Sequence, residues 1–290
     1  MVDLVNGLDI VDDDKLDHDH DHEHCEAYIL GKQYRLLFKR VMHRTKKPLE
    51  LVYSDLCSKF QVKLLGGRWY FISFIDDCTR LCRVYILPNK KAKTIKAVFE
   101  AYRVWAKNQM GGKIKAIRTD GGGEYHKKME ALLKRTSIKH QEMAPHTPQS
   151  NGISKRMNRT LMDMVCPMLE TSKAPLELWT EAVAAACYIK NHLPTHTLDG
   201  KTSYKAWTGE KPHVDQLQKF GCVVYRHIPK KKRRKLDQKS MEGILVGYKS
   251  DSGMYRVYYP QINKVAITRD VIICENEFMA ASDMSETIRE

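Results

Sequence analysis

The chain has 290 residues, 42% of them hydrophobic, which is enough for one sizeable core domain and a second small one. Its formal net charge of +14 points to a polyanionic partner, usually a nucleic acid; a basic protein without such a partner is the alternative. No apolar run approaches the roughly 18 residues that cross a bilayer, and no apolar leader follows a basic start. We therefore expect an intracellular protein without membrane contact, whose eight cysteines are reduced thiols.

The charge is unevenly distributed along the chain. Residues 1–30 contain ten acidic side chains and a single basic one, Lys15. Without this stretch, the totals of 49 basic and 35 acidic residues fall to 48 and 25, a net charge of +23. Four histidines alternate with the acids: His18, His20, His22 and His24. Such alternation can collect a divalent metal loosely, but the composition favours a solvated, disordered lead-in over the first 30 residues, within a first segment that we place at residues 1–43.

Taken in chain order, the first predicted elements are strands. Residues rich in Val, Ile, Tyr and Phe predict a strand over 49–55, ending in Asp55, and a β-hairpin over 68–87. Helical spacing of large apolar residues follows over 91–107.

A second run of elements completes the first domain. A short strand over 113–120 ends in Asp120, and it is followed by a helix at 124–135, a strand at 138–144, a Pro-rich loop at 145–152 and helices after Gly152 and over 176–192. The helix after Gly152 has an apolar stripe formed by Ile153, Met157, Leu161, Met164, Val165 and Met168. This order of strands and helices is that of an α/β fold of the RNase H-like type, a mixed sheet flanked by helices, which we place at residues 44–212.

The last part of the chain changes character. From 220 to 275, short apolar runs are separated by basic and Gly/Ser-containing segments, the pattern of a small all-β domain. We predict a small C-terminal β-barrel domain over 213–277, followed by a tail at 278–290.

Two acids are candidates for chemistry because each ends a predicted strand. Asp55 stands in VYSDLC and Asp120 in RTDGGGEY. Side chains at neighbouring strand ends can converge, and two carboxylates there can hold hard divalent cations such as Mg²⁺ through oxygen ligands. Two such ions about 4 Å apart can clamp the attacking and leaving oxygens of a phosphoryl transfer. Most acids at strand ends are only solvated or cap the strand. The assignment of a catalytic role to Asp55 and Asp120 therefore depends on the sequence around them.

That surrounding sequence resembles the integrase region of copia-type LTR retrotransposon Pol polyproteins. The resemblance runs from about Cys25 to Glu275 in the order and spacing of the family, and includes VYSDLC, YFISFIDDCTR, IRTDGGGEY, KHQEMAPHTPQSNGISKRMNRTL, KTSYKAWTGEKP and YRVYYPQINKVAITRDVI. It implies an RNase H-like core that processes element ends and joins them to target DNA. It also implies an Asp, Asp, Glu catalytic triad that uses Mg²⁺ or Mn²⁺, and self-association as in integrases.

Carried over by motif, Asp55 matches the first acid of the triad and Asp120 the second. The family's Glu falls in NGISKRMNRTL, where this chain has Lys155, 35 residues after Asp120. An ammonium in place of a carboxylate beside a divalent ion opposes metal binding by several kcal/mol, because two unit charges about 4 Å apart interact by roughly 4 kcal/mol at a dielectric of about 20. The resemblance therefore implies a metal site weakened at Asp55 and Asp120.

Two more departures from the family agree with a weakened enzyme. The zinc module that precedes the family's core keeps Cys25, but Tyr28 stands at the second Cys position, so we expect no intact zinc site. Pro167 falls where the family continues a helix. We expect it either to destabilise that helix by about 3 kcal/mol or to kink it.

Basic residues mark candidate contacts with nucleic acid. Beside Lys155, Arg156 and Arg159 fall off the apolar stripe of their helix. A second cluster has the composition of a nuclear-import signal or a phosphate-binding loop, a solvated barrel loop being the alternative: Lys230, Lys231, Lys232, Arg233, Arg234 and Lys235. We therefore expect a nuclear, DNA-binding integrase segment with impaired catalysis. The alternatives are an active integrase in which another acid replaces the Glu, and a host-retained DNA-binding protein that is not an enzyme.

Overall fold

The computed structural model describes residues 44–57, 69–120, 128–142, 152–249 and 253–279. The acidic lead-in, the predicted remnant of the zinc module with Cys25 and Tyr28, and nearly all of the tail lie outside these ranges. No helix in the described ranges is long and apolar enough to span a membrane.

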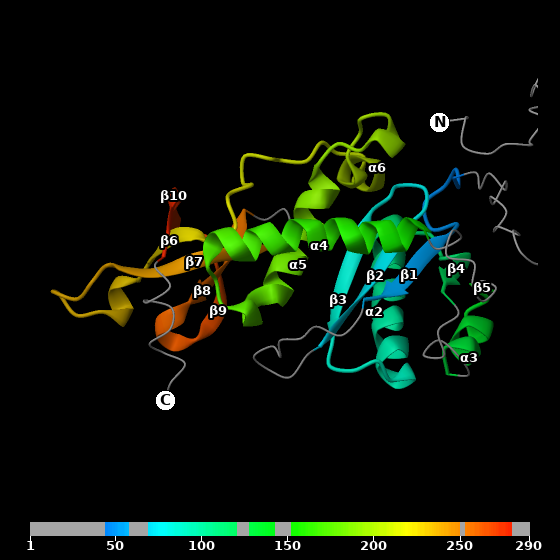
Figure 1. Ribbon diagram of the computed structural model, residues 1–290, viewed down its shortest axis with the longest axis horizontal. Helices are drawn as coiled ribbons and strands as arrows, with labels where there is room; N and C mark the ends of the chain where they lie inside the picture. The colour runs from blue at the N-terminus through cyan, green and yellow to red at the C-terminus, as the bar shows by residue number, and fades with distance from the viewer. Residues whose placement is uncertain (1–43, 58–68, 121–127, 143–151, 250–252, 280–290) are drawn as a thin grey trace, which may run out of the picture. The chain divides into compact units, whose positions relative to one another are not determined.

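A mixed five-stranded sheet forms the first domain (Figure 1). Its strands are β1 (Val52–Leu56), β2 (Tyr70–Asp76), β3 (Cys82–Leu87), β4 (Ala116–Thr119) and β5 (Lys139–Glu142). They are arranged in the order β3-β2-β1-β4-β5, with β1, β2 and β3 antiparallel and β1, β4 and β5 parallel. The predicted mixed sheet is thereby confirmed.

Both faces of this sheet are covered because its central strands are apolar on both sides. Val52 and Phe74 pack in a core with α2 (Ala92–Met110) and α3 (Lys128–Arg135), whereas Tyr53 and Phe71 pack in a core with the later helices. Residues that alternate along a strand point to opposite faces, so one strand contributes to two cores.

The predicted helix over 91–107 corresponds to α2, which presents an apolar stripe to the sheet. Its buried residues are Ile95, Phe99, Tyr102 and Ala106. The helix ends where Gly111 adopts a left-handed conformation, with φ of 64°, and donates its N–H to the carbonyl of Lys107.

The second face is covered by α4 (Gly152–Ser172) and by α5 (Trp179–His192), which follows the 3₁₀ turn η5 (Leu176–Leu178). The predicted stripe of α4 is only partly right. Leu161 and Val165 are buried and the other four members are half-buried, but the same face also buries Ser154 and Asn158.

Pro167 lies inside α4 and does not end it, and the expected kink or destabilisation stays a prediction. The helix continues for five residues beyond it, to Ser172, and Pro167 lies on the exposed side. The lost hydrogen bond to the carbonyl of Asp163 therefore falls where water can replace it.

The C-terminal part forms a second five-stranded sheet that is entirely antiparallel. Its strands are β6 (Cys222–His227), β7 (Ser240–Lys249), β8 (Met254–Tyr259), β9 (Lys264–Thr268) and β10 (Val271–Phe278). Their order is β10-β6-β7-β8-β9, and Val224, Leu245 and Val257 are among the residues of its own small core. The prediction of a small all-β domain after the α/β core is confirmed.

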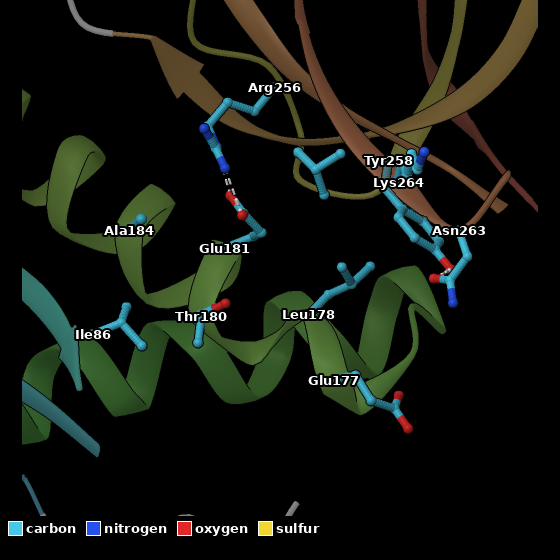
Figure 2. Close-up of a pocket in the computed structure, with 11 residues that line it drawn as sticks. Ile86, Glu177, Leu178, Thr180, Glu181, Ala184, Arg256, Tyr258, Asn263 and Lys264 are labelled. Atoms are coloured by element: carbon cyan, nitrogen blue, oxygen red, sulfur yellow. Dashed lines mark hydrogen bonds and ion pairs between the residues drawn. The ribbon is translucent and has the colours of Figure 1, made fainter. Parts of the chain in front are cut away.

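The second sheet packs directly on α5. Val223, Ile244 and Tyr258 belong to the same apolar cluster as Trp179 of that helix. Arg256 of β8 also makes a two-pronged ion pair with Glu181 of α5, in which Nε and Nη2 each lie 2.6 Å from a carboxylate oxygen. Figure 2 shows this pair at one side of a cavity of about 560 Å³ between α5 and strands β8 and β9.

Candidate active site

The strand that contains Asp55 and the strand that precedes Asp120 are neighbours in the first sheet. Strands β1 and β4 are parallel, with Val52 opposite Ile117 and Tyr53 opposite Arg118. Asp55 lies two residues after Tyr53, near the end of β1, and Asp120 lies two residues after Arg118, directly beyond the end of β4. In-register residues of neighbouring parallel strands are about 4.8 Å apart and point to the same face. Asp55 is 7% exposed, whereas Asp120, directly beyond the end of β4, is exposed to solvent.

Asn158 of α4 holds the Asp55 carboxylate. Its amide Nδ2 donates to Asp55 Oδ2 over 2.8 Å, and both side chains are buried. A hydrogen bond to a charged group stabilises by about 1.5–3 kcal/mol, so this contact fixes the carboxylate. The sequence-based reasoning missed Asn158 because it followed only the apolar residues of the helix. The available signal was the position of Asn158 one turn after Lys155 in the same motif.

Asn158 also carries an oxygen that could take part in ligand binding. Its Oδ1 is buried and has no hydrogen-bond partner in the part of the chain that the structure describes. An unsatisfied buried acceptor costs about 1–3 kcal/mol. An amide oxygen is a suitable ligand for a hard cation and also an acceptor for a bound water or hydroxyl.

Lys155 is exposed in the first turn of α4, between the buried Ser154 and Asn158. Residues three apart on a helix are neighbours on its surface, so the Lys155 ammonium lies on the side of α4 next to the residue that holds Asp55. Arg156 and Arg159 are exposed on the same helix. The first two turns of α4 therefore carry three exposed cations, of which Lys155 neighbours Asn158 on the helix surface.

The donor set does not fit a two-metal centre. Asp55, Asp120 and the Asn158 amide provide hard oxygens, whereas Lys155, at the position that the sequence comparison assigned to the third acid, carries a positive charge. Among the described residues, no group of three or more acidic, histidine or cysteine side chains converges on one point. Two carboxylates and one amide oxygen are fewer hard oxygens than a pair of divalent ions takes.

Two further acids, Asp76 and Asp77, serve the turn after β2 and do not complete the triad. Asp76 pairs with Val52 at the opposite end of β1 from Asp55. It accepts hydrogen bonds from the Leu49 and Thr79 backbone N–H groups and from the Thr79 hydroxyl. Burial raises the pKa of the Asp76 carboxyl, although these donors oppose the shift.

The basic segment predicted to contact nucleic acid forms the connection between β6 and β7, on a different domain from Asp55 and Asp120. Lys230, Lys231, Arg234 and Lys235 are exposed, and the side chain of Lys232 lies outside the description. Arg233 is half-buried, and its Nε donates to the Ile228 carbonyl over 3.2 Å. Arg233 therefore has a structural contact, and the exposed cations remain candidates for binding phosphate.

Comparisons with known proteins agree with this architecture. Residues 45–148 match the family model described as Integrase core domain, and residues 222–287 match the one described as Retroviral polymerase SH3-like domain. The two matches fall on the mixed sheet with its carboxylates and on the antiparallel sheet.

Similar proteins belong to plant retrotransposons. The chain is 38% identical over 266 residues to the Retrovirus-related Pol polyprotein from transposon TNT 1-94 of Nicotiana tabacum. The aligned region covers 91% of this chain and 20% of the relative. It is 30% identical over 254 residues to the corresponding polyprotein from transposon RE1 of Arabidopsis thaliana. Here the aligned region covers 88% of this chain and 17% of the relative. The chain thus spans about a fifth of the length of these relatives.

A solved structure shows the same fold at low sequence identity. A chain of the simian T-cell lymphotropic virus intasome, in complex with PP2A regulatory subunit B56 gamma, superposes with a TM-score of 0.53 at 16% identity. The match covers 80% of each chain.

Proposed function

The chain carries the integrase core and SH3-like domains of the copia-type retrotransposon Pol polyproteins, and from this premise we propose that it is an integrase segment that binds DNA with impaired catalysis. The observation that supports the proposal is the parallel pairing of β1 with β4, which makes the ends of these strands, and with them Asp55 and Asp120, neighbours; Lys155 stands at the third position. The fold and two carboxylates are those of the family, and the third charge is reversed.

The reversed charge is large enough to account for a loss of activity. At about 4 Å and a dielectric of about 20, the exchange of −1 for +1 changes the interaction with a nearby cation by several kcal/mol. Each 1.4 kcal/mol added to a barrier lowers a rate about tenfold. Integrase core domains use divalent metal ions. In this chain Asp55 and Asp120 would hold such an ion weakly, and the metal would supply charge stabilisation at phosphate.

The same cations that oppose a metal favour a DNA backbone. Lys155, Arg156 and Arg159 line the first turns of α4, and the exposed part of Lys230–Lys235 adds a second basic surface. The proposal includes DNA as the partner, self-association, and entry into the nucleus through Lys230–Lys235. These are proposed for this chain because it covers only about a fifth of the polyproteins that it resembles.

The test is the reversal of Lys155. We expect the unmodified chain to show little Mg²⁺- or Mn²⁺-dependent processing or joining of DNA ends. Lys155→Glu should raise metal affinity and restore activity, because it removes a repulsion and adds an oxygen ligand. Lys155→Gln serves as the control that removes the charge without adding a ligand.

The active-integrase alternative makes the opposite prediction. Robust joining by the unmodified chain that is lost in Asp55→Asn would overturn the impaired reading and show that another acid has taken the third position. DNA binding measured in the same samples shows whether the chain is folded and engages its substrate in either case.

A further inference from the structure

A second cavity, distinct from the carboxylate site, has two cysteine side chains in its wall. It measures about 610 Å³ and is walled by β3, α2, α5, α6 (Ser203–Thr208) and the end of β7. Cys82 of β3 and Cys187 of α5 both line it, and neither Asp55 nor Asp120 does. Several of the other lining residues are exposed to solvent, so small solutes in water can reach the cavity.

The two thiols lie next to each other although 105 residues separate them in the sequence. The Cys187 thiol donates to the Cys82 carbonyl oxygen over 3.3 Å. Cys82 is 2% exposed and Cys187 is 5% exposed, and both sulfurs are free thiols. The fold therefore brings two unlinked sulfurs, one from a strand and one from a helix, to one place in the wall of the cavity.

Asn191 fixes the backbone of Cys82 against α5. Its Oδ1 accepts from the Cys82 N–H over 2.9 Å, and its Nδ2 donates to the Cys82 carbonyl over 2.8 Å. Asn191 lies one turn after Cys187 on the same helix, and its Nδ2 is 3.9 Å from the Cys187 sulfur. One side-chain amide thus holds the strand residue beside the helix residue, so the two sulfurs are neighbours without a conformational change.

The two thiols differ in how readily they lose a proton. The interaction with the Cys187 side chain, followed by burial, raises the pKa of the Cys82 thiol well above its ordinary value. Cys82 therefore keeps its proton, whereas the attack on an oxidant requires a thiolate. Cys187 is accordingly the sulfur that reacts first, and Cys82 is the sulfur that reacts with the oxidised Cys187.

We propose that Cys82 and Cys187 are a modification site, at which a peroxide that enters the cavity closes a reversible disulfide. The Cys187 sulfur attacks one oxygen of hydrogen peroxide, the O–O bond breaks, and a sulfenic acid and one water form. The Cys82 sulfur then displaces the sulfenic oxygen as a second water and forms the S–S bond. The two thiols lose two electrons and two protons, and the peroxide is reduced to two waters. A dithiol reductant reverses the modification.

The disulfide would join the edge strand of the first sheet to the helix on which the second sheet packs. Because 105 residues separate the two cysteines, the bond restricts the unfolded chain strongly. Oxidation should therefore raise the thermal midpoint by several degrees, and dithiothreitol should return it to that of the reduced chain.

Peptide mass spectrometry of the folded full chain, treated with hydrogen peroxide, tests the site. Remaining thiols are blocked with iodoacetamide in denaturant, and the chain is digested without reductant. We expect the peptide that links Cys82 to Cys187 to exceed every other cysteine pairing by about tenfold or more, because groups already in place react as one molecule. Cys222 is the control within the chain: it is fully buried but lines neither of the two cavities, and it should stay reduced.

Single substitutions separate the roles of the two sulfurs. Cys82→Ser leaves Cys187 without a partner thiol, so a sulfenic acid should accumulate at Cys187 and be trapped by dimedone. Cys187→Ser should abolish the linked peptide and leave Cys82 without a dimedone adduct. Cys166→Ser, which removes an exposed thiol of α4, is the matched control and should leave the cross-link unchanged. Thermal midpoints of the reduced variants show that each is folded.

Two outcomes would overturn the proposal. One is the absence of the linked peptide at every peroxide concentration that leaves the chain folded, and the other is a linked peptide that forms only in urea. Dimedone labelling of Cys82 in place of Cys187 would overturn the order of attack. These measurements involve neither DNA nor a metal ion, so their result is independent of the function proposed above.

Discussion

Asn158 shows how a single polar residue can organise a charged site in an otherwise apolar helix face. Its amide approaches Asp55 from the same face of α4 that carries Leu161 and Val165 into the core. The neutral amide can donate to a carboxylate without adding a charge. An acid at this position would place two negative charges in a buried contact.

Asn158→Asp is therefore expected to destabilise the fold at neutral pH. Two carboxylates about 3 Å apart cannot both be ionised without a large penalty, so the folded state of the variant favours a bound proton. Stability should then be reduced by about 1–3 kcal/mol near pH 7 and should recover towards that of the parent as the pH falls. Urea unfolding of both proteins at a series of pH values measures this. Asp163→Asn, at an exposed position of the same helix, is the control.

Cys222 provides a second test at the scale of one side chain. It is fully buried in the second sheet, and burial raises the pKa of its thiol to about 11. At about pH 8, only about one molecule in a thousand carries the reactive thiolate. We expect iodoacetamide to label exposed Cys166 readily and Cys222 hardly at all, with Cys222 labelling rising about tenfold per pH unit. Peptide mass spectrometry separates the two sites, and equal labelling rates in the folded protein would contradict the assigned burial.

At the scale of elements, the end of α4 and the start of β6 meet at Gly221. This glycine has φ of +84°, and a Cβ built on it would lie 2.0 Å from the Cβ of Ser172, the last residue of α4. Gly209, at the end of α6, has nearly the same φ, +85°, but no atom within 4 Å of an added Cβ. The pair separates backbone strain from steric exclusion.

Gly209→Ala should destabilise the fold by about 1–2 kcal/mol, the strain of a left-handed conformation alone. Gly221→Ala should cost about 2–5 kcal/mol, because the clash with Ser172 is added to the same strain. Thermal or urea unfolding of the two variants gives the comparison. A Gly221→Ala protein no less stable than Gly209→Ala would show that α4 and β6 do not approach this closely.

The strands and helices could be predicted where the local sequence pattern determines them. Asp55 was expected at the end of a strand and lies next to the end of β1, and Asp120 directly follows β4, which pairs with β1 in parallel. Asn158 was missed because hydrophobic periodicity identifies apolar positions and does not reveal a polar residue turned inward. Trp105 and Trp207 lie about 100 residues apart on different helices, so their stacking depends on tertiary packing that no local pattern encodes.

For the molecule as a whole, the excess of basic residues predicts how it binds DNA. Neutralised phosphates release counterions, so affinity for a short duplex should fall by about tenfold or more between about 50 and 200 mM salt, with little dependence on sequence. Replacing Lys230, Lys231, Arg234 and Lys235 by Gln should make this dependence shallower. Arg233 is left in place because it bonds to the Ile228 carbonyl. Affinity that hardly responds to salt would argue against the electrostatic mode of binding.

The apolar cluster that joins α5 to the second sheet has a genetic consequence. Val223, Ile244 and Tyr258 belong to the same buried cluster as Trp179 of α5. Residues from the last quarter of the chain therefore complete part of the hydrophobic core of the α/β domain. With a stop codon or frameshift before β6, the carboxylates, α4 and its basic residues would all be translated. The truncated protein would, however, expose the apolar surface of α5 and would be prone to aggregation. Copies of such an element damaged late in this region would be silenced by loss of soluble protein, even though every residue of the carboxylate site had been read correctly.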